Sequence, residues 1–438
     1  METSLEHMSS IRPDCYSNIK CGYCGNASGN ISYQVYATDL TAEFYQKLLD
    51  RGWRRSGTVL YKPDLRASCC PPYAIRVDSL KYRPSKDQRQ KLNRFNKQMI
   101  GQRYLQAAAR LYPLTREQAK KRKQDFDLIE RIHESEVYEQ KGSLQHDHSF
   151  VVTVEASNFS EEKYSLYENY QRVVHRQSPT SIDRNAFTSF LCDSPVRNKL
   201  TNNQICDQQI GTYHQCYRIN GILVAMGVLD LLPNCVSAIY FMYHENVKKF
   251  DFGKLSAMRE IALAKENGYH WWYPGFYIHD CIKMRYKAEY SPVYILGPES
   301  YQWQLFTKDL KHAFSIKKYH SLIIDSTRTP TGPLTHLSDL SKISDEDSIN
   351  EDLSHVIDAD VPLFARNMPG ILTREELPME SDLGKMFVKL YYTERFACDL
   401  EDWGSSSIDD LYSIKGIVAE VFSAFGPELC KEIFLNFQ

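Results

Sequence analysis

Two pairs of cysteines near the start of the chain restrict how its first eighty residues can fold. In Cys21-Gly-Tyr-Cys24 two residues separate the thiols, and this spacing lets both thiolates bind one metal ion. The second pair, Cys69-Cys70, is adjacent and precedes Pro71-Pro72, which would stiffen a turn that directs both thiols to one ion. Four sulfur ligands suit zinc or an iron–sulfur cluster. Unrelated buried thiols are the alternative, but two such pairs in one short segment are a rare accident. We therefore expect residues 1–80 to form a cysteine-rich metal-binding domain.

The overall composition is that of an ordinary globular protein. Of the 438 residues, 42% are hydrophobic and 25% are charged, which argues against a largely disordered or fibrous chain. Residues 1–13 lack the apolar core of a secretory signal. The most apolar stretch, 222–243, is interrupted by Asp230 and Pro233, so we expect no membrane span. These features predict a cytoplasmic protein, with the nucleus as a further compartment, whose cysteines are reduced or bind metal.

The next segment is strongly basic. Residues 81–123 contain 14 lysines and arginines against two acidic residues, a net charge of +12, and their apolar spacing predicts helices. A surface of this charge attracts nucleic acid. Alternatively, its charges pair with the acidic, serine-rich segment 339–360, which carries a net charge of −7. We expect residues 81–147 to form a basic helical segment.

The order of predicted elements in residues 148–310 is typical of an α/β (α+β) fold of the acetyltransferase-like (GNAT) type. The pattern predicts a strand at 149–156 and a helix after Ser160, followed by three antiparallel strands at 213–219, 222–229 and 236–243. A helix at 255–266 and a last strand at 271–278 complete the order. Asn220-Gly221 is a strong hairpin signal, because both residues tolerate positive φ. In this fold two neighbouring strands splay apart and admit the acyl donor.

Two further features of the sequence concern the donor and the tail. The turn that would hold the pyrophosphate of coenzyme A, residues 249–254, contains a single glycine, so we expect no coenzyme A. Residues 311–438 are predicted to form a C-terminal helical extension with the acidic loop 339–360. The apolar stretches 382–396 and 408–437 are its predicted helices.

Several residues in the predicted acetyltransferase-like domain, residues 148–310, could take part in chemistry. His214 could act as a base, although a lone strand histidine is more often a satisfied structural residue. Asp230 lies in an apolar strand and needs a cationic or hydrogen-bonding partner, which could be a ligand cation or a neighbouring turn. The aromatic run 271–277, with the cations that follow, could stack a terminal base and hold its phosphates. Its alternative is a strand core with solvated cations.

At these residues the chain resembles the eukaryotic arginyl-tRNA–protein transferases. The resemblance covers about residues 15–305 and rests on a set of short runs, which are Cys21-Gly-Tyr-Cys-Gly25, Gly52-Trp-Arg-Arg-Ser-Gly57, Tyr61-Lys-Pro63, Cys69-Cys-Pro71, Gly211-Thr-Tyr-His-Gln215, Tyr277-Ile-His279, Lys283-Met-Arg-Tyr-Lys287 and Pro298-Glu-Ser-Tyr-Gln-Trp303. Where family members often have Leu-Gly-Tyr, this chain has Pro274-Gly-Phe276. Bacterial relatives that carry leucine share the later domain.

The resemblance implies that arginine passes from arginyl-tRNA to the α-amine of proteins that begin with Asp, Glu or oxidised Cys, which marks them for degradation. It also implies roles for particular residues. The predicted sets are His214, Asp230 and Tyr277 for catalysis; Arg54, Arg55, Lys62 and Arg76 for the acidic N-terminus; Lys120, Lys121, Arg122, Lys123, Lys283, Arg285 and Lys287 for tRNA; and Cys21, Cys24, Cys69 and Cys70 for metal. The alternatives are a coenzyme A-dependent N-acetyltransferase and a non-catalytic module that binds RNA or N-termini around a structural metal.

Overall fold

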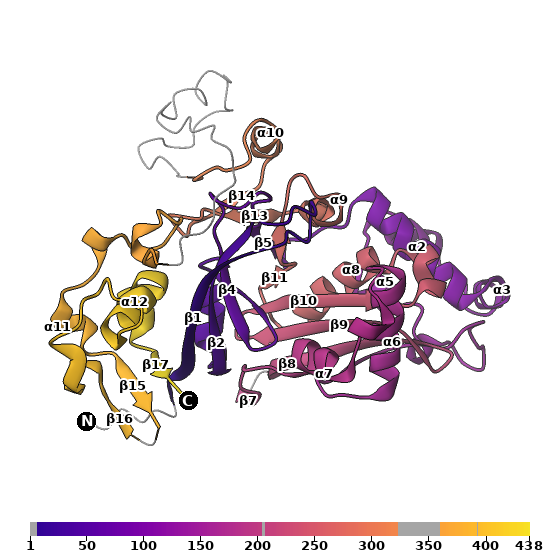
Figure 1. Ribbon diagram of the computed structural model, residues 1–438. Helices are drawn as coiled ribbons and strands as arrows, with labels where there is room; N and C mark the ends of the chain where they lie inside the picture. The colour runs from indigo at the N-terminus through magenta and orange to yellow at the C-terminus, as the bar shows by residue number, and fades with distance from the viewer. Residues whose placement is uncertain (1–6, 204–205, 323–359, 392) are drawn as a thin grey trace.

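The computed structural model describes residues 7–203, 206–322, 360–391 and 393–438. Its described strands form two sheets that lie side by side (Figure 1). The first sheet has seven strands in the order β16-β15-β17-β1-β2-β4-β3. Their bounds are β1 Ser9–Ile19, β2 Asn30–Asp39, β3 Arg54–Ser56, β4 Val59–Pro63, β15 Phe387–Leu390, β16 Thr393–Phe396 and β17 Ile433–Asn436.

The second sheet has ten strands, with a main path β14-β13-β5-β11-β10-β9-β8-β6, while β12 pairs with β5 and β7 with β8. Their bounds are β5 Tyr73–Asp78, β6 Phe150–Ala156, β7 Lys199–Asn203, β8 Cys206–Ile219, β9 Ile222–Leu232, β10 Cys235–Tyr243, β11 Trp271–Tyr273, β12 Phe276–Tyr277, β13 Val293–Leu296 and β14 Trp303–Leu305. The predicted hairpin between β8 and β9 is present, with positive φ at both Asn220 and Gly221.

Helices cover both faces of the second sheet. On one face α8, α2 and α5 contribute to a large apolar core with β9, β10 and β5, and on the other α6 and α7 build a smaller core. The helices of the described chain are α1 Ala42–Leu49, α2 Lys86–Ile100, α3 Gln102–Leu111, α4 Arg116–Gln124, α5 Leu128–His133, α6 Glu161–Val173, α7 Arg184–Phe187, α8 Phe252–Glu266, α9 Ile282–Arg285, α10 Lys308–Ile316, α11 Glu380–Leu383 and α12 Ile414–Cys430. None of them combines the length and apolarity needed to cross a bilayer.

The sheets cross the domain boundaries that the sequence suggested. Strand β5, within residues 1–80, pairs with β11 and β13, so this part of the predicted metal-binding domain is a strand of the second sheet. The tail is not purely helical, because β17 pairs in parallel with β1 and β15 pairs with β17. Edge pairing between distant segments overrides local helix propensity here. All of the acidic loop 339–360 except Asp360 lies outside the described residues.

Strands β10 and β11 diverge in the middle of the second sheet. They pair in parallel only between Cys235–Ser237 and Trp271–Tyr273. Beyond that point β10 continues to Tyr243 paired with β9, whereas the chain after β11 turns at Pro274-Gly275 and β12 joins β5. The predicted single strand 271–278 is therefore two strands, because a proline and a glycine with φ +89° interrupt it. We call the place where β10 and β12 separate the strand divergence.

Candidate functional site

The four predicted metal ligands come together at the tips of two loops. Cys21 and Cys24 lie between β1 and β2, and Cys69 and Cys70 lie between β4 and β5. Their four sulfur atoms all lie within 4.8 Å of one another, and the Sγ atoms of Cys24 and Cys69 are 3.4 Å apart. Gly29 permits this approach, because a Cβ atom there would lie 2.9 Å from the sulfur of Cys69.

The donor set fits a metal centre. Sulfurs bound at about 2.3 Å to one tetrahedral zinc lie about 3.8 Å apart, which is close to the spacing of these four thiols. Cys21 and Cys70 are buried and pack with Ile278, Cys281 and Met284. The cluster therefore supports the segment that follows β12, next to the strand divergence.

A row of polar side chains crosses four strands at the strand divergence. Thr212 pairs with Asp230, Asp230 pairs with Ser237, and Ser237 pairs with Tyr273, and side chains at opposed positions lie on one face of a sheet. Two consecutive arginines of strand β3, Arg54 and Arg55, contact this row from the first sheet. Their environments differ.

Arg54 is a buried cation without a full set of partners. It is 3% exposed and donates one hydrogen bond, from Nη1 to the hydroxyl of Ser237 at 3.3 Å. Its Nε and Nη2 atoms have no partner among the described residues. The rings of Tyr273 and Phe276 lie 5.4 and 5.6 Å from its guanidinium carbon, which compensates the charge in part. Because an unpaired buried charge is costly, these free N–H groups point to an anionic or carbonyl ligand.

Arg55 is fully paired, in contrast. Its Nε and Nη2 atoms donate to the two carboxylate oxygens of Asp230 at 2.8 and 2.7 Å, and both side chains are almost completely buried. Nη1 donates to the carbonyl of Gly57, and Thr212 donates to Asp230 at 2.6 Å. This corrects two predictions: every guanidinium nitrogen of Arg55 already has a partner within the protein, and the partner that Asp230 needs is Arg55 rather than a ligand.

Lys287 lies beside the strand divergence and is half-buried. Its Nζ is 3.4 Å from the position of a Cβ atom at Gly275. Burial and, to a smaller extent, the charge of Arg54 lower the pKa of Lys287 to about 8, against the opposing charge of Glu260. The other two predicted tRNA contacts of this segment, Lys283 and Arg285, are exposed on α9.

Glu260 is a buried carboxyl that the sequence analysis missed. It lies on α8, is 3% exposed, and accepts a hydrogen bond from the indole Nε1 of Trp272 at 2.8 Å. Burial raises the pKa of Glu260 to about 7, against the effects of that hydrogen bond and of Lys287. A carboxyl in this environment can exchange a proton near neutral pH. The sequence signal was a glutamate directly before the apolar run Ile261–Ala264 of a predicted helix.

The remaining two predicted cations of the acidic-N-terminus pocket both have partners, although Nε of Arg76 is buried without one among the described residues. Lys62 is buried and donates to the carbonyl of Arg51 at 2.8 Å and to the hydroxyl of Tyr301 at 3.0 Å, and burial lowers its pKa to about 7. Arg76 lies over the indoles of Trp271 and Trp303, at 3.7 and 4.3 Å. It also pairs with Asp50 at 3.2 Å. Neither lies on the polar row.

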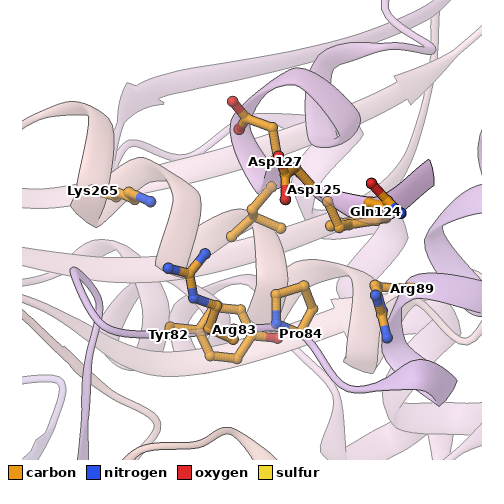
Figure 2. Close-up of a pocket in the computed structure, with 10 residues that line it drawn as sticks. Tyr82, Arg83, Pro84, Arg89, Gln124, Asp125, Asp127 and Lys265 are labelled. Atoms are coloured by element: carbon orange, nitrogen blue, oxygen red, sulfur yellow. The ribbon is translucent and has the colours of Figure 1, made fainter. Parts of the chain in front are cut away.

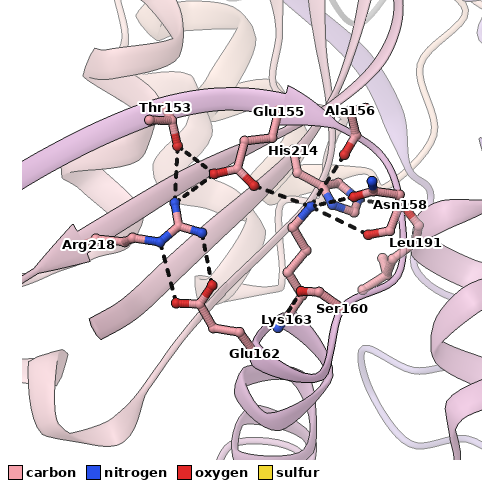
Figure 3. Close-up of polar contacts among 10 residues, drawn as sticks. All are labelled: Thr153, Glu155, Ala156, Asn158, Ser160, Glu162, Lys163, Leu191, His214 and Arg218. Carbon is pink, nitrogen blue, oxygen red and sulfur yellow. Dashed lines mark hydrogen bonds and ion pairs between the residues drawn. The ribbon is translucent and has the colours of Figure 1, made fainter. Parts of the chain in front are cut away.

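His214 is enclosed in the protein interior (Figure 3). Its Nε2 donates to the carbonyl of Leu191 at 2.9 Å, and its Nδ1 has no partner in the described chain. Burial lowers the pKa of His214 to about 4. Nearby, Lys163 donates to Asn158 at 3.1 Å and Arg218 bridges Glu155 and Glu162. This environment favours the structural interpretation that the sequence analysis weighed against a catalytic one.

Tyr277 and the lysine run lie away from the polar row. The hydroxyl of Tyr277 is 2.8 Å from Nδ1 of His279, its ring packs edge-on against Phe306, and burial raises its pKa to about 12. The run Lys120–Lys123 lies on α4. Lys120 and Lys121 are exposed, Arg122 pairs with two glutamates of the next helix, and the side chain of Lys123 lies outside the described part.

Comparison with known proteins agrees with the resemblance found in the sequence. Residues 19–90 match the family model described as arginine-tRNA-protein transferase, N terminus, and residues 162–297 match the corresponding C terminus. Arginyl-tRNA–protein transferase 2 of Arabidopsis thaliana is 26% identical, over 77% of this chain and 82% of the relative. Arginyl-tRNA–protein transferase 1 of Saccharomyces cerevisiae is 30% identical, over 62% and 58%. An aspartate/glutamate leucyltransferase of Stutzerimonas stutzeri is 25% identical, over 63% and 89%. The chain is therefore similar to the arginyl-tRNA–protein transferases in both of the regions that the two family models describe.

Proposed function

We propose that this protein transfers arginine from arginyl-tRNA to the N-terminal α-amine of proteins that begin with Asp, Glu or oxidised Cys, and so marks them for degradation. The names of the relatives support the reaction and, in the leucyltransferase, an acidic acceptor. The observation that carries the proposal is Arg54. Its Nε and Nη2 nitrogens at the strand divergence, which have no partner among the described residues, would bind the acidic side chain of the acceptor.

The reaction needs positioning more than activation. The α-amine nitrogen attacks the ester carbonyl carbon, the bond from that carbon to the terminal ribose oxygen breaks, and an amide bond forms. The ribose oxygen leaves as a hydroxyl with one proton of the amine. An α-amine with a pKa of about 7.7–8.0 is partly neutral at cellular pH, so bringing the two ends together can supply most of the acceleration.

Further parts of the proposal concern the fold and the metal. We assign the second sheet to the acetyltransferase-like class, with the ester terminus of the tRNA at the strand divergence. Zinc or an iron–sulfur cluster bound by the four cysteines would hold the two loops together and so stiffen the neighbouring segment 278–284.

Coenzyme A is a poorer acyl donor for this chain. Asp251 lies at the start of α8, where its carboxylate would repel a pyrophosphate.

The test is a transfer assay with labelled arginyl-tRNA and two peptides that differ only in their first residue, Asp or Ala. We expect the wild-type protein to label the Asp peptide. Arg54→Gln should lower kcat/KM for that peptide by about 10- to 150-fold, from about 1.5–3 kcal/mol for hydrogen bonds to a charged group. Arg395→Gln, an exposed change in the tail, is the control. The absence of wild-type transfer would remove the function, and tight binding of both substrates without turnover would favour the non-catalytic module.

A further inference from the structure

A pocket of about 460 Å³ opens beside the start of α2, and none of its lining residues belongs to the cysteine cluster (Figure 2). Four segments build it: the link before α2, α2 itself, the turn from α4 to α5, and the end of α8. Its polar lining residues are Arg83, Arg89, Gln124, Asp125, Asp127 and Lys265. The volume lies within the range of small-ligand sites. We call it the α2 pocket.

Three cations of the α2 pocket, Arg83, Arg89 and Lys265, are free to bind an anion. In the described part of the chain, none of them has a carboxylate within ion-pairing distance. Other cations nearby are tied, since Arg122 pairs with Glu130 and Glu134. The uncompensated charge on the pocket wall would attract a phosphate group.

The opposite wall carries acceptors. Asp127 is used by the fold, because its carboxylate accepts from the backbone N–H groups at the start of α5. Asp125 has no side-chain hydrogen-bond partner among the described residues and lines the pocket next to Gln124 (Figure 2). An inorganic anion would gain nothing from a carboxylate here. A nucleotide would, because its base presents amino or imino donors while its phosphate is an acceptor.

A second pocket continues the first along α2. It has about 370 Å³, shares Arg89 and Phe126 with the α2 pocket, and is lined also by Lys86 and Arg122. The guanidinium carbons of Arg89 and Arg131 lie 5.9 and 5.8 Å from the centroid of the shared Phe126 ring, and a base entering here would stack on this aromatic and cationic group. A strand of RNA can therefore run along the groove between α2 and α4 with one nucleotide seated in the α2 pocket.

We propose that the α2 pocket binds a single nucleotide of the tRNA, with the phosphate on its cations and the base edge on Asp125. This inference rests on the proposed function, because it takes arginyl-tRNA as the partner. It differs from the expectation for the lysine run on α4, which would contact backbone phosphates alone.

The first test compares two charge-matched double variants on the same helix region. Arg83→Gln with Arg89→Gln removes two pocket cations, whereas Arg94→Gln with Lys97→Gln removes two exposed cations of α2 outside either pocket. The probe is tRNA without an attached amino acid, and its binding is measured by filter binding at several salt concentrations. We expect the pocket variant to bind tRNA at least tenfold more weakly, and the slope of log affinity against log salt concentration to become about 1–2 less steep. The control variant should lose less than threefold in affinity. Equal losses would overturn the proposal.

The second test separates base contact from general electrostatics. Asp125→Asn removes a negative charge, so an electrostatic surface alone would bind tRNA more tightly after this change. A base contact predicts the opposite, at least fivefold weaker binding. Tighter binding would reduce the α2 pocket to a non-specific surface. Both tests measure tRNA binding without transfer, so a failure of the arginine-transfer assay leaves their outcomes readable on their own.

Discussion

Replacement of Asp230 by asparagine distinguishes a structural carboxylate from a catalytic one. In the native protein Asp230 accepts two hydrogen bonds from Arg55 and one from Thr212, and both members of the ion pair are at most 1% exposed. Asp230→Asn leaves the guanidinium of Arg55 buried without its counter-charge. Removal of one partner of a buried ion pair costs about 3–5 kcal/mol. We expect the free energy of unfolding to fall by this amount in urea titrations followed by tryptophan fluorescence.

The matched control removes both charges together. Arg55→Met with Asp230→Leu replaces the pair by apolar side chains of similar size, which is often neutral or stabilising. The double variant should therefore recover most of the stability that the single change loses. If Asp230→Asn instead unfolds at the wild-type urea concentration and has no transfer activity, the carboxylate takes part in chemistry and the reasoning from its buried pair is refuted.

Three further outcomes follow from the site. Cys21→Ser or Cys70→Ser should release bound metal, as measured by elemental analysis of the purified protein; unchanged metal content would contradict the ligand assignment. His214→Gln keeps a donor for the Leu191 carbonyl, so we expect transfer within threefold of wild type, and a large loss of kcat with unchanged stability would return His214 to catalysis. For Glu260, whose pKa rises from 4.5 to about 7 on folding, the folded state keeps its proton to higher pH than the unfolded state. Wild-type stability should thus fall as pH rises from about 4.5 to 7, by about 3 kcal/mol at 1.36 kcal/mol per pKa unit. Glu260→Gln should abolish that part of the pH dependence, and identical pH profiles of unfolding would contradict it.

Local signals in the sequence predicted local structure well. Asn220-Gly221 forms the hairpin between β8 and β9 because two positive φ angles at adjacent residues need no distant partner. Ser160 caps α6 as expected, with its hydroxyl accepting from the N–H of Lys163. The two cysteine pairs lie together in the structure as the sequence predicted. The spacing of metal ligands within each pair was the local signal for this.

Long-range pairing was beyond these signals. The stretch 382–396 has helical periodicity, but Phe387–Leu390 forms a strand because the edge of β17 offers it hydrogen bonds. Asp230 was known to need a cation, yet nothing in the sequence selects Arg55, 175 residues away, over its neighbour Arg54. Partner choice depends on how the two sheets meet, and that geometry is a property of the whole fold.

The neighbouring arginines of β3 are coupled by the polar row. Both side chains are buried, but only Arg55 has a counter-charge, Asp230, whereas the Nε and Nη2 nitrogens of Arg54 have no partner among the described residues. The bidentate ion pair between Arg55 and Asp230 fixes the backbone of β3. Arg54 projects from the same backbone, so the ion pair also holds Arg54 in place although Arg54 itself has no counter-charge. On this argument Asp230→Asn has a second consequence besides lost stability. At a temperature where the variant is still folded, its KM for the Asp peptide should rise more than its kcat falls, since the chemistry is intact but Arg54 is less well positioned. A proportional loss in kcat alone would mean that the two arginines act independently.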